Sequence, residues 1–374
     1  MAILVFIVTI LILVVLHELG HFLAAKRFNI KVLEFGFGIP PRVFGKKWGE
    51  TLVSLNWLPF GGFVKLLGED EDDPDALKSK RSFASQTVWK RIAVVVAGVT
   101  MNLSLAWLLY WIILGTQSFK TQIPLLTPYH FVGVSQTNEN IILISSVAKN
   151  SPAELAHLQP GDRISEFNGE FLNDSDQFIQ KIKESAGTPV TLTITDIQRI
   201  TLRTVTVIPR QSPPPGEGSL GVALGSVAVA NLEYKGVVGK ILSAPIHSYN
   251  LTVYSVAVLS ETINKAISSR NLAPVSNTVS GPVGITHYIS DILAIKNPLL
   301  PYLEFLAMLS LNLAIVNILP FPGLDGGRLF FLLWEACTRK KVSPLVEKYI
   351  HSIGLVVLIG LIILVTASDI KKLF

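Results

Sequence analysis

Four apolar runs of membrane-spanning length, or slightly less, constrain this 374-residue chain most strongly. They cover residues 2–25, 92–114, 303–319 and 353–366. A helix needs about 20 apolar residues to cross the hydrocarbon core of a bilayer. Only 16% of the residues are charged, against roughly 25% in an ordinary soluble domain. The sequence therefore predicts a polytopic α-helical membrane protein with about four transmembrane helices.

The distribution of basic residues predicts the orientation of these helices. Residues 26–91 hold twelve Lys and Arg, whereas the much longer stretch 116–301 holds thirteen. Short cytoplasmic loops are enriched in positive charge. We therefore expect a multi-pass protein of the plasma (inner) membrane with 26–91 and 320–350 on the cytoplasmic side and 115–301 outside. Lys371 and Lys372 then lie outside, where positive charge after the last span is a weak determinant of topology.

The segment between the first two spans combines strand-forming residues with glycine and proline, in EFGFGIPPRVFGKKWGETLVSLNWLPFGGFVKLLGED. Its alternating runs at 51–57 and 63–67 predict strands of a β-hairpin. The segment is too apolar for an ordinary cytoplasmic loop, so we expect a membrane-associated hairpin. The acidic run 69–73 that follows predicts a solvated loop with no metal role.

A soluble α+β module is predicted between the second and third spans. Its elements, in chain order, are a strand at 141–147, a helix at 151–158, a turn at 160–162, the strand RISEFNG, a helix from Asp174 or Ser175 to about 186, two β-rich runs within 189–209, and a last strand GSLGVALG. This order, and most specifically SPAELAHLQPGDRISEFNG, resembles a PDZ domain at 127–228. A PDZ domain adds an extended peptide to a sheet edge, so the resemblance implies a peptide or C-terminal tail as partner. A spacer that only restricts access is the alternative.

The rest of the chain completes a four-part organisation. Residues 229–301 contain an amphipathic stretch near 244–267, which favours a helix lying against the membrane surface. We expect a first membrane part at 1–118, the PDZ domain at 127–228, an extracytoplasmic linker region at 229–301 and a second membrane part at 302–374.

The motif HELGH places three ionisable side chains near the end of the first span. His17 and His21 are four residues apart, so on a helix they share one face within reach of a single metal ion, with Glu18 beside them. Zinc held by two imidazoles needs a third protein ligand and an open position for water, and Glu18 is placed to take the proton of that water. A chance match with two interfacial histidines is the alternative. Lipid exposure of these groups would be costly, and zinc in a wet cavity removes that cost.

The third zinc ligand is expected to be His, Asp or Glu, because Cys337 is the single cysteine. Asp325 is the best candidate. Pro320 and Pro322 break the helix before it and let the chain turn back, and two glycines after it allow close approach to another helix. Taken alone, Asp325 is more often an ordinary turn aspartate.

HELGH in the first span and NILPFPGLDG after the third, with a PDZ-like module between them, resemble the site-2 protease family of intramembrane zinc metalloproteases, in its subgroup with a single extracytoplasmic PDZ domain. The resemblance implies regulated intramembrane proteolysis, with hydrolysis of peptide bonds within or near the transmembrane segment of membrane-protein substrates. It implies His17, His21 and Asp325 as zinc ligands and Glu18 as the catalytic base. His21 lies roughly 7 Å and His17 roughly 13 Å along the helix from Lys26, so with Lys26 at the cytoplasmic surface we expect the metal on the cytoplasmic side of the bilayer. The implied substrate-binding residues are Asn317, Asn102, Gly61, Gly62 and Phe63, the last three in a membrane re-entrant β-loop.

Two other functions are compatible with parts of the sequence. A non-catalytic PDZ-containing membrane adaptor is expected to lack Glu18 or a metal ligand, and this chain retains all of them. A metal transporter usually carries polar groups along several spans, and here they concentrate at one depth. The net charge of +5 comes without an aromatic-rich basic motif, so no nucleic-acid partner is expected.

Overall fold

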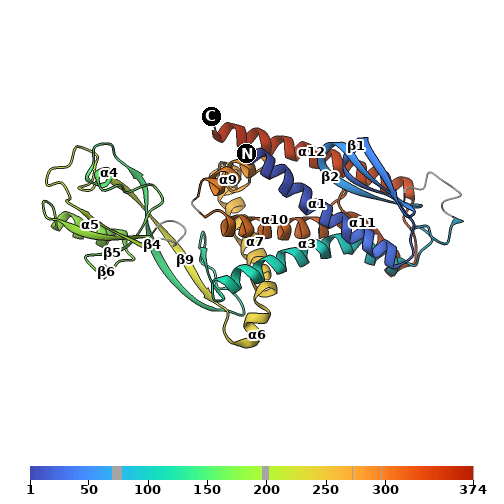
Figure 1. Ribbon diagram of the computed structural model, residues 1–374, viewed down its shortest axis with the longest axis horizontal. Coiled ribbons are helices and arrows are strands. Elements are labelled where there is room, and N and C mark those ends of the chain that lie inside the picture. The colour runs from blue at the N-terminus through green and yellow to red at the C-terminus, as the bar shows by residue number, and fades with distance from the viewer. Residues whose placement is uncertain (70–77, 196–201, 272, 296, 374) are drawn as a thin grey trace. The chain divides into compact units, whose positions relative to one another are not determined.

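The computed structural model describes the chain except for residues 70–77, 196–201, 272, 296 and 374. It divides into two compact units: Met1–Thr116 together with Ser243–Phe374, and Gln117–Leu242. We call them the helical unit and the sheet unit (Figure 1).

The helical unit contains the predicted membrane spans. Its elements are α1 (Ala2–Arg27), β1 (Val32–Trp48), β2 (Thr51–Leu66), α3 (Val88–Thr116), α7 (Ser243–Ser269), α8 (Ala273–Thr278), α9 (Pro282–Ala294), α10 (Leu299–Ile318), α11 (Asp325–Thr338) and α12 (Pro344–Leu373). Within the described residues, α1, α3, α10 and α12 are long and apolar enough to cross a membrane, which confirms the expected number of spans. The last two spans are longer than predicted, because residues outside the apolar runs 303–319 and 353–366 continue both helices.

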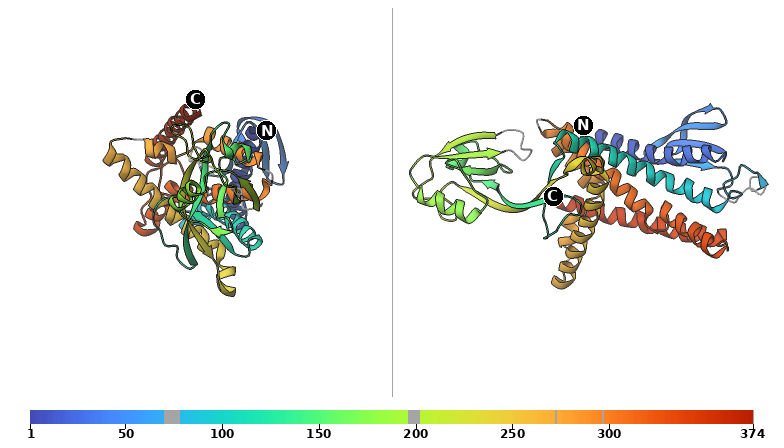
Figure 2. Two further views of the ribbon diagram at one scale, coloured as in Figure 1. Left: turned by 90° about the vertical axis from the view of Figure 1, so that its left-hand side faces the viewer. Right: turned by 90° about the horizontal axis from the view of Figure 1, so that it is seen from below.

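Helix α3 packs against both α1 and α10 and organises the helical unit. A Cβ atom built on Gly20 of α1 would lie 2.3 Å from the backbone oxygen of Ala97 in α3. Such a contact excludes any side chain at this position, so the two backbones approach closely only because residue 20 is glycine. The long helices of this unit run along a similar direction, whereas α7 crosses them (Figure 2).

The predicted β-hairpin is confirmed. Strands β1 and β2 pair with each other, and the predicted runs 51–57 and 63–67 both lie within β2. The register shows that these two runs pair separately with β1. Phe35 pairs with both Val53 and Val64, so the first half of β1 lies between the two halves of β2. The last segment of β2 consequently lies at a sheet edge, next to α1.

The chain reverses between α10 and α11, as the two prolines predicted. Leu319 is extended because it precedes a proline, which disfavours helical backbone. Helix α11 then begins at Asp325 and packs directly on the turn. A Cβ on Gly326 would lie 1.9 Å from the backbone oxygen of Leu319, and a Cβ on Gly327 would lie 2.5 Å from that of Phe321. Asp325 therefore starts a helix that is held against the end of α10.

The sheet unit is a seven-stranded antiparallel sheet with short helices. Its elements are β3 (Lys120–Pro124), β4 (Ser135–Val147), α4 (Pro152–Leu155), β5 (Arg163–Phe167), β6 (Glu170–Phe171), α5 (Ser175–Glu184), β7 (Val190–Thr195), β8 (Leu202–Val207), β9 (Val222–Glu233) and α6 (Gly236–Ile241). The strand order is β3-β9-β4-β5-β7-β8, with β6 paired to β5. Phe178 and Ile182 of α5 are buried in the same core as Ile164 and Leu192 of the sheet.

The elements of the sheet unit follow the predicted order with shifted ends. Asp174 caps α5 by accepting a hydrogen bond from the backbone N–H of Asp176, as the sequence predicted. The helix predicted at 151–158 ends at Leu155, since His157 has a left-handed backbone (φ 56°) that stops it.

Residues 229–301 are divided between the two units. Strand β9 continues to Glu233, which pairs with Lys120 of β3, so the sheet extends past residue 228. Helix α7 contains the amphipathic stretch predicted at 244–267 and belongs to the helical unit. The chain therefore leaves the sheet unit near Leu242 and re-enters the helical unit at Ser243.

Candidate metal centre

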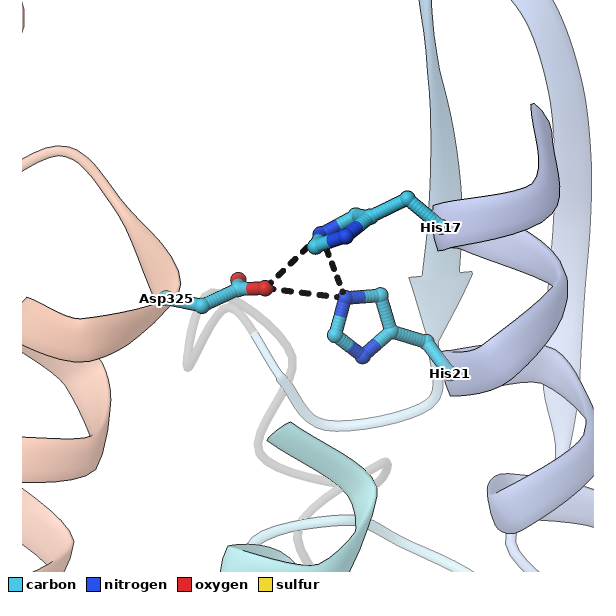
Figure 3. Close-up of side chains that lie close together, drawn as sticks. All are labelled: His17, His21 and Asp325. Carbon is cyan, nitrogen blue, oxygen red and sulfur yellow. Dashed lines mark hydrogen bonds and ion pairs between the residues drawn. The ribbon is translucent and has the colours of Figure 1, made fainter. Parts of the chain in front are cut away.

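His17, His21 and Asp325 converge from two helices of the helical unit (Figure 3). Oδ2 of Asp325 lies 2.9 Å from Nε2 of His17 and 3.0 Å from Nε2 of His21. The two Nε2 atoms are 3.2 Å apart. Two residues one helical turn apart in α1 are thereby joined to a side chain more than 300 positions later.

The two histidines are oriented by groups in α3. Nδ1 of His21 lies 2.8 Å from the backbone oxygen of Val94. A carbonyl oxygen only accepts, so Nδ1 carries the hydrogen and Nε2 presents its lone pair to the centre. Nδ1 of His17 faces the side-chain amide of Asn102, with 3.3 Å to the atom assigned as Nδ2. The nitrogen and oxygen of a side-chain amide can be assigned either way round. With the opposite assignment, the amide oxygen of Asn102 accepts a hydrogen bond from Nδ1–H of His17.

The three side chains fit a zinc ion. Two imidazole nitrogens and one carboxylate oxygen are a usual protein ligand set for catalytic zinc, which keeps a further position open for water. Oδ2 of Asp325 supplies the oxygen of this ligand set, because it faces both Nε2 atoms at 2.9 and 3.0 Å.

A cavity of about 190 Å³ opens beside the metal centre. It is formed by residues from α1, β2, α3 and α11, including Glu18, His21, Phe63, Val64, Asp325 and Arg328. Glu18 therefore lines the same small space as the metal ligands, together with the edge of the hairpin. A Cβ on Gly62 would lie 3.3 Å from Cγ of Glu18, so the hairpin backbone passes directly beside the glutamate.

The other residues implied by the resemblance have different positions. Asn102 is completely buried against His17. Gly61 lies within β2 with a left-handed backbone (φ 81°), and a Cβ atom there would face Ile39; it is not among the described residues that line the cavity. Asn317 lies half-buried in the last turn of α10 and is not among the described residues that line the cavity.

The sequence reasoning missed an ion pair at the wall of the cavity. Arg328, one turn after Asp325, pairs with Glu69, which also accepts a hydrogen bond from the backbone N–H of Leu66. The nearby Glu69 carboxylate raises the pKa of Arg328, which keeps the guanidinium group charged. Glu69 was expected to belong to a solvated acidic loop, and it is instead largely buried by its contact with α11; residues 70–73 of that run lie outside the described residues.

A second missed ion pair joins α11 to α3. Arg91 and Glu335 form it, and both side chains are mostly buried, 9% and 17% exposed. Both pairs contain a charged residue beside or within an otherwise apolar segment, and this feature is visible in the sequence. A charged residue needs a partner when it is buried. The two ion pairs attach α11, and so Asp325, to β2 and α3.

Comparison with known proteins places the chain in a family. The family model described as Peptidase family M50 matches residues 5–361. A Clostridium perfringens protein named as a candidate zinc metalloprotease is 32% identical over 96% of this chain and 95% of its own length. The Regulator of sigma-W protease RasP of Bacillus subtilis is 28% identical over 97% of this chain and 96% of its own, and the Zinc metalloprotease RasP of Geobacillus kaustophilus is 27% identical over 99% and 97%. The chain belongs to peptidase family M50 and is a multi-pass membrane zinc metalloprotease of the site-2 protease type.

Proposed function

We propose that this protein hydrolyses peptide bonds within or near the transmembrane segment of membrane-protein substrates, in regulated intramembrane proteolysis. The observation that carries the proposal is the cavity in which Glu18, His21 and Asp325 meet the edge of the hairpin. All four features belong to a unit whose long helices are apolar enough to lie in a bilayer.

Each side chain at the centre has a defined part in this proposal. His17, His21 and Asp325 hold zinc, and Asn102 and the backbone oxygen of Val94 orient the two imidazoles. When bound, zinc activates a water molecule and polarises the scissile carbonyl group. Glu18 takes the proton of the attacking water and gives it to the leaving amine.

The hairpin edge supplies what a transmembrane substrate requires. A peptide bond inside a helix is shielded by the hydrogen bonds of the helix, so the substrate must unwind before water attacks. Gly62 and Phe63 lie in the edge segment of β2 beside Glu18. We propose that this edge pairs with the unwound substrate backbone, and that Asn317 at the end of α10 provides a further polar contact.

The sheet unit and helix α7 also have parts in the proposed function. The sheet unit acts as an extracytoplasmic PDZ domain that recognises a peptide or C-terminal tail, supported by the order of its strands and the capped helix α5. The metal centre lies towards the cytoplasmic side, because His21 precedes the basic end of α1 at Lys26 by five residues, about 7 Å of helix. Helix α7, which crosses the long helices, lies along the membrane surface.

The experiment that tests the proposal separates chemistry from metal binding. The purified protein is expected to hold about one zinc per chain, which is the content of a mononuclear catalytic site. Glu18→Gln should abolish cleavage of a single-span reporter in vesicles while the zinc content stays unchanged, because Glu18 is not a ligand. Glu304→Gln removes an exposed carboxylate from α10 and is the matched control, with normal cleavage expected. Normal cleavage by the Glu18→Gln protein would refute the assigned role.

A further inference from the structure

A second cavity lies on the hairpin, away from the metal ligands. Its volume is about 460 Å³, within the range of about 300–1,000 Å³ for small-molecule sites. Its lining is largely apolar and includes Phe37, Phe44, Trp48, Val53 and Leu55, with Lys46, Lys47 and Ser54. We call it the hairpin groove. Glu18, His17, His21 and Asp325 are not among its lining residues, so it is distinct from the catalytic cavity.

The strand register explains the composition of the groove. Phe44 pairs with Leu55, and Lys46 pairs with Val53, so these four side chains lie on one face of the sheet. Lys47 pairs with Leu52 and so starts from the opposite face, but it also borders the groove. Phe37 also pairs with Leu55 and extends the same face towards α1. The face is highly exposed for its composition, with Phe44 64% and Trp48 83% exposed. An apolar surface of this kind on a protein calls for an apolar partner.

The hairpin contacts define the depth of the groove relative to α1. The turn after β1 lies level with the end of α1, because Glu50 forms an ion pair of 2.7 Å with Lys26. Gly62 lies beside Glu18, eight residues or about 12 Å further into the helix. Trp48, two residues before Glu50, consequently lies at the level of the basic helix end, and Phe44 and Leu55 lie deeper along the span.

The charges at the shallow end of the groove are positive and without an acidic partner. Lys46 and Lys47 are both exposed, and neither has an ion-pair partner in the part of the chain that the structure describes. Lys26, at the same level, is already paired with Glu50. The groove thus combines an apolar floor at acyl-chain depth with two unpaired ammonium groups at headgroup depth, and a Trp at the boundary, where its amphipathic ring is favoured.

We propose that the hairpin groove binds one anionic phospholipid, with an acyl chain on Phe37, Phe44 and Leu55 and the phosphate-containing headgroup beside Lys46 and Lys47. Charge complementarity selects this occupant. A zwitterionic lipid offers the same acyl chains but no net charge to the two lysines, whereas a basic residue near an anionic surface contributes about fivefold in affinity. A phospholipid bound in the groove attaches the hairpin to the membrane surface, together with the edge of β2 that lies beside Glu18.

Quenching of Trp48 fluorescence by lipids with brominated acyl chains tests this site on the full-length protein. The chain has six tryptophans, so the Trp48 signal is the difference between the protein and its Trp48→Phe variant. We expect this signal to be quenched at least twofold more by brominated phosphatidylglycerol than by brominated phosphatidylcholine in mixed vesicles of fixed total lipid. The readout requires neither zinc nor catalysis, so it is independent of the proposed proteolysis.

A pair of charge-matched variants completes the experiment. Lys46→Gln with Lys47→Gln should abolish the preference for phosphatidylglycerol. Lys340→Gln with Lys341→Gln, which removes another adjacent and exposed lysine pair, should retain it. Equal quenching by the two lipids, or equal loss in both double variants, would refute a specific site. Absence of quenching by either lipid would show that protein covers the groove, and would refute the proposal as well.

Discussion

Gly98 of α3 lies directly against the imidazole ring of His21. A Cβ atom on Gly98 would lie 2.4 Å from Nε2 of His21 and 2.8 Å from Cε1 of His17. Atoms of folded proteins do not approach this closely, so both metal-binding rings occupy space that only a glycine leaves free. The backbone of α3 is therefore one wall of the metal centre, although none of its side chains is expected to bind the metal.

Gly98→Ala should weaken zinc binding, because its methyl group would displace both imidazole rings. We expect the zinc dissociation constant to rise about tenfold or more, comparable to the loss of a group that orients a ligand. Metal content after dialysis against graded chelator measures the effect. Gly360→Ala is the matched control in α12, since a Cβ there meets open space, and it should bind zinc normally.

Asp325→Ala should remove one of the three protein ligands. The carboxylate oxygen that faces both Nε2 atoms at 2.9 and 3.0 Å is then absent, so zinc is left with two imidazoles. Retained zinc should fall to less than about a tenth of an equivalent, since catalytic zinc sites use three protein ligands. Asp291→Ala removes an exposed carboxylate from α9 and should change nothing. Unchanged zinc in the Asp325 variant would exclude this residue from the ligand set.

Asn102→Ala should lower metal affinity without removing a ligand. Asn102 is buried and faces Nδ1 of His17, so its loss leaves that nitrogen without its orienting partner. A loss of about 10- to 100-fold in zinc affinity is typical for such a change. Asn312→Ala, on the exposed side of α10, is the control. Cleavage reduced at unchanged zinc affinity would instead assign Asn102 to substrate binding, as the family resemblance implied.

Neutralising either partner of the Arg328–Glu69 ion pair should loosen the attachment of α11 to the hairpin. Arg328→Gln and Glu69→Gln each leave one charge without its partner in a largely buried place, which is the costly arrangement. We expect each single variant to lower both the melting temperature and the zinc affinity, and the double variant to lose less than the sum of the two. Arg27→Gln, at an exposed position of α1, is the control. Strictly additive losses would show that the two residues do not act as a pair.

Much of the helical unit followed from local sequence. Apolar runs that reach or approach membrane-spanning length admit hardly any structure other than a helix inside a bilayer, so the existence of α1, α3, α10 and α12 was predictable. The helix ends were less predictable. The polar residues at either end of α12 continue the helix, and hydropathy does not report on them.

The hairpin was predictable in type but not in topology. Alternating residues and glycine punctuation indicate strands. They do not specify that Phe35 pairs with two segments of β2 at once, because pairing depends on which strands meet in space.

The sequence by itself determined that α1 carries two histidines and a glutamate on one turn, because helical periodicity sets the spacing of His17 and His21. It also determined that the chain breaks at Pro320, because a proline excludes the preceding residue from helical backbone. Only the tertiary structure decided that Asp325 reaches these histidines, that Gly98 makes room for their rings and that Arg328 pairs with Glu69. These contacts join residues far apart in the chain, and their geometry depends on how α3 and α11 pack against α1, which no local pattern specifies.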